Sequence, residues 1–188
     1  MLDLAAAREA PIAYLTPVAI AGAALGVAPA AARFLLRGAD AIAPAGSAFG
    51  VPVPTAPGRA YVADGRAALW LGPDEWLLIA PAAEGEALQR ELVAALTGVA
   101  HALVDVSHRQ TALLVDGPGA ALLLNAGVPL DLSIPAFPVG AVARTIFDKV
   151  EIVLWRQATE RFRVEVWRSF APYLRALLEA ARNDNIVL

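Results

Sequence analysis

The stretch A-A-L-W-L-G-P-D-E-W-L-L-I-A-P, residues 67–81, is the clearest structural signal in the chain. Ala67–Leu71 and Glu75–Ala80 are apolar runs of strand length. The glycine, proline and aspartate at positions 72–74 between them are residue types that form tight turns. The pattern therefore predicts two strands that pair as an antiparallel hairpin.

The segments on either side of this hairpin predict the rest of the first half. Arg33–Arg37 is typical of a short strand, and a helix is expected around Ala39–Phe49. Gly50–Gly58 contains three prolines and is expected to be a loop. Glu84–Leu96 has apolar residues at the three-to-four spacing of an amphipathic helix.

The second half of the sequence predicts a similar succession. The expected elements are strands at His101–Val106 and Gln110–Val115, a helix from Gly117 to about Ala126, a loop over Gly127–Gly140, strands at Val142–Phe147, Val150–Arg156 and Phe162–Trp167, and a helix over Phe170–Ala181.

A short internal repeat relates the two halves. Leu35-Leu36, a helix and then F-G-V-P (residues 49–52) recur as Leu113-Leu114, a helix and then A-G-V-P (residues 126–129). Each copy is followed by a strand pair and a helix. The sequence thus predicts an α+β fold built from two related strand-helix-strand-strand-helix halves.

We expect one domain over residues 33–182, with halves at about 33–98 and 101–182. Residues 1–32 are expected to be an extended N-terminal arm that packs on a neighbour, and residues 183–188 a short tail.

An uncharged stretch, Ala10–Ala32, is long enough to span a bilayer. Pro11, Pro17 and Pro29 interrupt it, and its apolarity comes mostly from Ala and Gly rather than from Leu and Ile. We therefore expect no membrane span, although a peripheral membrane protein that uses residues 10–32 is an open alternative.

Composition narrows the possible partners. The 188 residues are 58% hydrophobic and 18% charged, with a formal net charge of −3 and no cysteine. The charge excludes nucleic acid as an expected partner, and the missing cysteines exclude disulfides and thiolate chemistry. The excess of apolar residues predicts an interface with another protein, and a cytoplasmic location fits the cysteine count.

The most polar constellation is D-V-S-H-R, residues 105–109. Asp105, Ser107 and His108 are the residue types of a nucleophilic triad, but neighbours on a strand point to opposite faces. We expect a turn in which Asp105 or Ser107 bonds to nearby backbone, and no catalytic residue.

Two other motifs offer chemistry. Gly117-Pro118-Gly119 lies between a strand and a helix, as in dinucleotide-binding loops, but Leu122 stands where the third glycine is needed. We expect the glycines to serve a tight turn. His101 and His108 are the two histidines, and no acidic cluster accompanies them, so no metal site is predicted.

Aromatic and basic residues concentrate on the expected strands. The tryptophans are Trp70, Trp76, Trp155 and Trp167. They are expected to pack in a core or an interface, with an aromatic cage for a flat ligand as the alternative. The arginines of the C-terminal region predict a solvated or partner-facing sheet surface; they are Arg144, Arg156, Arg161, Arg163 and Arg168.

Three blocks carry a resemblance: residues 67–81, residues 105–119 (D-V-S-H-R-Q-T-A-L-L-V-D-G-P-G) and Arg144–Phe170. In order and spacing they resemble the sarcosine oxidase gamma subunit family over roughly residues 33–182. The combination of L-W-L-G-P-D-E-W-L-L with D-V-S-H-R is fairly specific.

That family resembles in turn the folate-binding fold of the glycine cleavage T-protein. The resemblance implies an acidic pair that contacts folate on a later strand, where this chain has Val150-Glu151-Ile152. At most Glu151 matches the pair, and Thr145-Ile146-Phe147 replaces the glycines before it. We therefore carry over the fold and not the folate site.

The resemblance implies a non-catalytic subunit of heterotetrameric sarcosine oxidase that supports assembly. Such a complex demethylates sarcosine oxidatively to glycine, with hydrogen peroxide and formaldehyde or methylene-tetrahydrofolate as the other products. The implied partners are larger alpha and beta flavoprotein subunits and a small delta subunit. FAD, FMN, NAD and zinc are implied in those subunits and not in this chain. A free-standing tetrahydrofolate-binding or aminomethyl-transfer protein of the same fold is the alternative.

Overall fold

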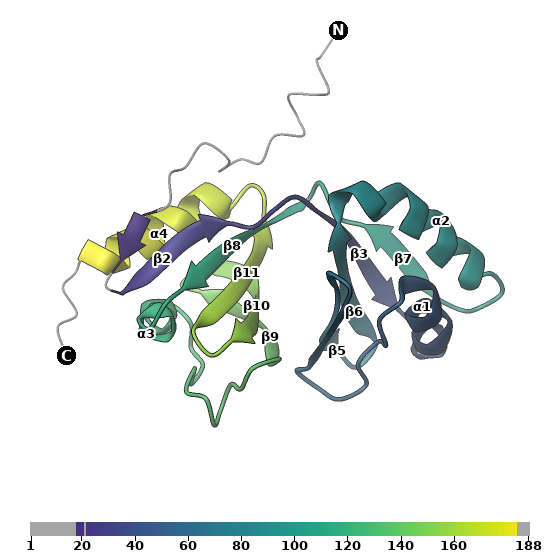
Figure 1. The fold of residues 1–188 in the computed structure, drawn as a ribbon, viewed down its shortest axis with the longest axis horizontal. Coiled ribbons are helices and arrows are strands. Elements are labelled where there is room, and N and C mark those ends of the chain that lie inside the picture. The colour runs from purple at the N-terminus through teal and green to yellow at the C-terminus, as the bar shows by residue number, and fades with distance from the viewer. Residues whose placement is uncertain (1–17, 21, 184–188) are drawn as a thin grey trace, which may run out of the picture. The chain divides into compact units, whose positions relative to one another are not determined.

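A computed structural model describes residues 18–20 and 22–183. The chain divides into two compact units (Figure 1). Unit 1 contains the described residues up to Ala28, His108–Val139 and the described residues from Arg144 onward. Unit 2 contains Pro29–Ser107 and Gly140–Ala143.

Unit 2 is a five-stranded antiparallel sheet with the strand order β4-β5-β6-β3-β7. Its strands are β3 (Ala31–Arg37), β4 (Ala60–Ala63), β5 (Arg66–Gly72), β6 (Glu75–Pro81) and β7 (Ala102–Asp105). Its helices are α1 (Ile42–Phe49) and α2 (Gly85–Ala95), each preceded by a 3₁₀ turn, η2 (Ala39–Ala41) and η3 (Ala82–Glu84).

The core of unit 2 lies between one face of this sheet and the two helices. Phe34, Trp76 and Leu78 from the strands form one buried cluster with Phe49 of α1 and Leu88 of α2. The alternation of strand side chains and the three-to-four spacing on α2 supply these contacts. The predicted hairpin is confirmed, because β5 and β6 pair antiparallel, with a register shift between Trp70 and Gly72.

Unit 1 is a six-stranded sheet with the order β1-β2-β8-β11-β10-β9. Its strands are β1 (Val18–Ile20), β2 (Ala23–Val27), β8 (Gln110–Asp116), β9 (Val142–Phe147, whose first two residues are counted with unit 2), β10 (Val150–Ala158) and β11 (Arg161–Trp167). Its helices are α3 (Ala120–Asn125) and α4 (Ala171–Asn183). Phe162, Val164 and Val166 alternate along β11 and are buried, as are Leu174 and Leu178 of α4.

The two units repeat one topology, which confirms the predicted α+β class with two related halves. Read from β4, the sheet of unit 2 runs β4-β5-β6-β3-β7, and read from β9, that of unit 1 runs β9-β10-β11-β8-β2. The β4–β5 and β9–β10 turns both hold an aspartate at positive φ, Asp64 at 49° and Asp148 at 53°.

The boundaries between the repeats differ from the expected ones. β7 precedes β8 in the chain but pairs with β3 in unit 2, and β2 precedes β3 but pairs with β8 in unit 1. Each repeat therefore receives its last strand from the segment that leads into the other repeat. This exchange is why the units are not the consecutive stretches 33–98 and 101–182.

The expected arm is partly sheet. β1 and β2 occupy residues 18–20 and 23–27, and Ala23 and Leu25 of β2 are buried because the strand pairs with β8. Residues 1–17 lie outside the described residues, as do residues 184–188 of the expected tail. Across the described ranges, no helix is long and apolar enough to cross a membrane.

Candidate functional site

The D-V-S-H-R segment forms a turn, as expected. The Asp105 Oδ1 accepts a hydrogen bond from the Ser107 backbone N–H at 2.8 Å. The Ser107 Oγ accepts one from the Arg33 backbone N–H at 2.8 Å, next to the 2.8 Å bond from the Val106 N–H to the Arg33 carbonyl. The Ser107 hydroxyl therefore continues the β3–β7 ladder, the Asp105 carboxylate closes the turn, and the side chain of His108 is exposed.

The glycines of the G-P-G segment serve a close backbone approach. Gly117 has φ +117°, and a Cβ on it would lie 2.4 Å from the Gly22 carbonyl oxygen. Gly38 holds the matching position after β3 in unit 2, with φ +113° and a virtual Cβ 2.6 Å from the Ala100 carbonyl oxygen. The strands around Gly117 are antiparallel, so the parallel β-α-β context of a dinucleotide loop is missing there.

In the part of the chain that the structure describes, histidine and acidic residues do not gather into a metal site. Within residues 18–20 and 22–183, no three His, Cys, Asp or Glu side chains are close enough to hold an ion. His101 instead bonds through Nδ1 to the Val99 carbonyl at 2.8 Å.

Most tryptophans pack as core residues rather than as a cage. Trp76 is 1% exposed, and its Nε1 donates to the Pro54 carbonyl at 2.7 Å. Trp70 is its cross-strand partner and packs against the same core, while Trp155 is buried in unit 1. Trp167 differs, because 41% of it is exposed.

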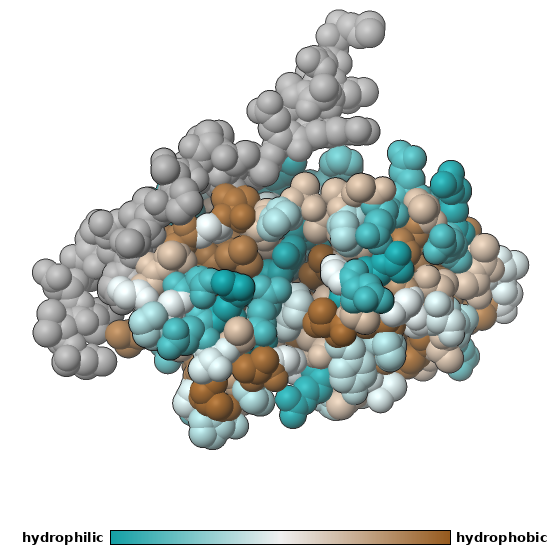
Figure 2. Space-filling view, in the orientation of Figure 1, coloured by the Kyte–Doolittle hydropathy of each residue, from teal (hydrophilic) through white to brown (hydrophobic). Residues whose placement is uncertain are grey.

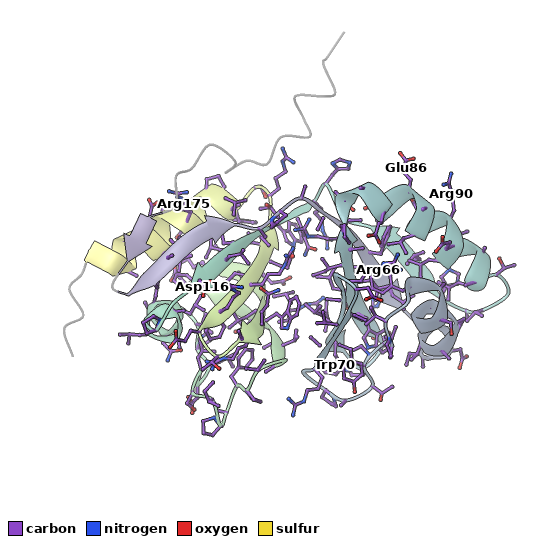
Figure 3. The ribbon with its side chains drawn as sticks, in the orientation of Figure 1. Arg66, Trp70, Glu86, Arg90, Asp116 and Arg175 are labelled. Carbon is purple, nitrogen blue, oxygen red and sulfur yellow. The ribbon has the colours of Figure 1, made fainter. Side chains whose placement is uncertain are left out.

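The C-terminal arginines divide between surface and interior: Arg144 and Arg161 are exposed, as expected, whereas Arg156 and Arg163 are buried. Arg163 is buried and pairs with Glu165 at 2.7 Å, and Glu165 is only 1% exposed. Arg161 pairs with Asp116, which Figure 3 labels on the neighbouring strand.

Arg156 is the largest departure from the expected surface position. It is 1% exposed, and its guanidinium lies 4.4 Å from the centroid of the Phe162 ring. Its N–H groups donate to the carbonyls of Leu132 and Thr159. Burial lowers the pKa of the Arg156 guanidinium below its ordinary value. The side chain thus ties the segment around Leu132 to β10.

Glu151, the single match to the folate-contacting acids, is exposed on β10 between the buried residues Val150 and Ile152. A second acid does not accompany it on this strand, whose sequence is V-E-I-V-L-W-R-Q-A.

Exposed apolar groups lie in small clusters between polar ones on the face shown in Figure 2. Exposure alone therefore does not mark a site in this molecule. Among the described residues of unit 1, every exposed aromatic side chain belongs to one set, Trp167, Phe170 and Tyr173. With Arg109 these three residues form what we call the aromatic patch.

Backbone bonds fix the patch. The Arg168 N–H donates to the Arg109 carbonyl at 2.8 Å, which holds the turn before β8 against the end of β11. The Phe170 N–H donates to the Trp167 carbonyl at 2.9 Å and sets the turn into α4. The Arg109 guanidinium lies 5.0 Å from the Trp167 ring centroid, and the Trp167 and Phe170 centroids are 6.5 Å apart.

Sequence reasoning missed this patch. The apolar residues of α4 include Tyr173 with Leu174 and Leu178, but Tyr173 is 45% exposed while both leucines are buried. The spacing of aromatics at 167, 170 and 173, across a strand end and a helix start, is the signal that could have found it.

Comparison with protein families identifies the family to which this sequence belongs. Residues 37–184 match the model of the sarcosine oxidase, gamma subunit family. The chain belongs to this family.

Similar gamma subunits support the assignment. The sarcosine oxidase subunit gamma of Corynebacterium sp. (strain U-96) is 31% identical over 92% of this chain and 89% of its own length. That of Arthrobacter sp. is 40% identical over 63% of this chain, and there the match spans only 58% of the relative.

Solved structures agree in fold. A chain of the heterotetrameric sarcosine oxidase from Corynebacterium sp. U-96, determined in complex with pyrrole 2-carboxylate, has a TM-score of 0.85 and 31% identity, covering 94% of this chain and 95% of that one. The glycine cleavage system aminomethyltransferase T from Bartonella henselae has a TM-score of 0.66 at 18% identity, covering 85% and 46%. The second likeness confirms the expected T-protein-like fold alone.

Proposed function

We propose that this chain is the gamma subunit of a heterotetrameric sarcosine oxidase and that it supports assembly rather than catalysis. The observation that carries the proposal is the structural match at TM-score 0.85 to a chain of that heterotetrameric enzyme, over 94% of this chain.

The use of its polar residues supports a structural role. The groups that most resemble a catalytic set, Asp105 and Ser107, bond to backbone N–H groups of a turn and a strand. The remaining strongly buried cations and acids pair with one another or with carbonyls, as Arg163 does with Glu165 and Arg156 with Leu132.

The rest of the proposal concerns the complex. Its alpha, beta and delta subunits would carry the FAD, FMN, NAD and zinc and oxidise sarcosine to glycine, with hydrogen peroxide and formaldehyde or methylene-tetrahydrofolate. A cytoplasmic location is part of the same proposal.

Omission of the chain tests the assembly role. The partner subunits would be expressed with and without this chain, and flavin absorption, complex size and sarcosine oxidation would be measured. We expect the yellow assembled complex to be lost or reduced when the chain is omitted. A complex of unchanged size and activity without it would overturn the proposal.

A tetrahydrofolate-binding or aminomethyl-transfer protein is the alternative, and the T-protein-like fold is what favours it. Glu151 is its one candidate acid. Calorimetric titration with tetrahydrofolate decides it: heat that Glu151→Gln abolishes would support this alternative, and no heat would dismiss it.

A further inference from the structure

We propose that the aromatic patch, formed by Arg109, Trp167, Phe170 and Tyr173, is the surface by which this chain docks on another subunit of the heterotetramer. The partner surface would be apolar and would place a carboxylate against Arg109. This inference rests on the proposed function, because it takes the heterotetramer as the setting and names the docking surface.

The composition of the patch is that of an interface centre. Trp167, Phe170 and Tyr173 are 41%, 46% and 45% exposed and lie next to an arginine. Trp, Tyr and Arg are the residue types that dominate binding energy at protein interfaces. Single exposed apolar residues are ordinary, but in unit 1 the exposed aromatics among the described residues are gathered here.

The patch is also organised before any partner binds. Arg109 is held over the Trp167 ring, and Trp167 and Phe170 contact at a tilt of 55°. The Tyr173 hydroxyl lies 3.4 Å from Asp148 Oδ2 in the β9–β10 turn. Aromatic side chains fixed in this way lose little conformational freedom on binding, which strengthens association.

Charge defines the partner. Arg109 is exposed, and within the described part of the chain no carboxylate lies within ion-pair distance of it. Its guanidinium lies 5.0 Å from the Trp167 ring centroid, and a guanidinium beside a ring can still donate N–H bonds to a carboxylate.

The same charge argues against a second copy of this chain. A two-fold contact centred on the patch would bring Arg109 of one copy against Arg109 of the other. Like charges that meet across an interface oppose association. A different subunit with an acidic rim fits the patch, and a copy of this chain does not.

The test uses the full chain expressed together with its partner subunits, with the tag on the largest partner. Trp167→Ala and Arg109→Glu are the test variants. Tyr61→Ala and Arg90→Glu are matched controls, because Tyr61 is an aromatic residue of unit 2 that is 42% exposed and Arg90 projects from α2 (Figure 3). Thermal unfolding of each purified variant checks that it folds.

We expect each patch variant to weaken association roughly tenfold or more, since residues at interface centres carry most of the binding energy. Both controls should bind like the unchanged chain. If the unchanged chain co-purifies and folded patch variants co-purify equally well, the docking surface is wrong while the proposed function stands. If the unchanged chain does not co-purify, both are overturned. If the patch variants instead abolish self-association of the chain alone, a second copy is the occupant and the proposal fails.

Discussion

Substitution of Gly117 by Ala should destabilise the protein far more than substitution of Gly98. At Gly117 the added Cβ meets the Gly22 carbonyl oxygen at 2.4 Å, and φ is +117°. Gly98 also has positive φ, +79°, but nothing lies within 4 Å of its virtual Cβ. The pair therefore separates the cost of the clash from the cost of the backbone conformation alone.

The expected magnitudes follow from these two terms. A non-glycine residue in left-handed backbone costs about 1–2 kcal/mol, which is the whole effect at Gly98. Overpacking against fixed backbone adds about 1–3 kcal/mol, so Gly117→Ala should lose about 2–5 kcal/mol. For a chain of this length that lowers Tm by roughly 5–20 °C. Gly38→Ala should match Gly117→Ala, because its virtual Cβ lies 2.6 Å from the Ala100 carbonyl oxygen.

Urea unfolding followed by tryptophan fluorescence measures these losses, with circular dichroism to confirm that each variant folds. Similar losses at Gly38 and Gly117, both larger than at Gly98, would support equivalent strand junctions in the two units. A Gly117→Ala variant as stable as Gly98→Ala would refute the close approach on which this reasoning depends.

Three further predictions concern stability. Arg156→Ala should lower the free energy of unfolding in urea by about 2–4 kcal/mol, because it leaves a cavity and deprives the Leu132 carbonyl of its donor. Arg156→Met should lower it by roughly half as much, since the methionine side chain fills the space without burying a charge. An equal cost for both would contradict this. Trp76→Phe should lose about 1–3 kcal/mol by differential scanning calorimetry, because the Pro54 carbonyl loses its buried N–H donor; an unchanged Tm would show that this bond contributes nothing. The backbone N–H of Ser133 donates to the Asp131 carboxylate and holds the pKa of Asp131 below its ordinary 3.8. The stability that the ionised carboxylate contributes is therefore present above pH 3.8 and is lost as the pH falls through the lower pKa of the folded state. On acidification, the urea unfolding midpoint should therefore fall less for Asp131→Asn than for the unchanged chain. Equal falls would show that ionised Asp131 does not stabilise the fold.

The secondary structure was largely predictable, because apolar runs and turn residues mark the elements locally. The hairpin of β5 and β6 follows from apolar runs around residues 72–74. β4 was not anticipated, since it is a four-residue edge strand whose Tyr61 and Val62 are exposed, so no buried face marks it. The sequence predicts an extended arm where β1 and β2 lie, because the prolines and alanines of that stretch obscure the short alternation of Ala23 and Leu25.

The pairing of strands could not be predicted from local pattern. The sequences of β7 and β2 do not indicate that β7 pairs with β3 and β2 pairs with β8. Strand partners depend on the packing of the whole fold. Whether each arginine is buried or exposed could not be predicted for a similar reason. Arg156 and Arg161 are alike in sequence, yet Arg156 is buried against Phe162 while Arg161 pairs with Asp116 at an exposed position. The aromatic patch joins Arg109 to a segment nearly sixty positions later, and only the pairing of β8 with β11 brings them together.

Native mass spectrometry of the tagged full chain, purified at its natural expression level, shows which proteins the chain assembles with. We expect the chain in a yellow complex with three other, different subunits, and we expect dissociation of the complex to release flavin. A colourless chain that is alone, or bound only to copies of itself, would overturn the proposed subunit role.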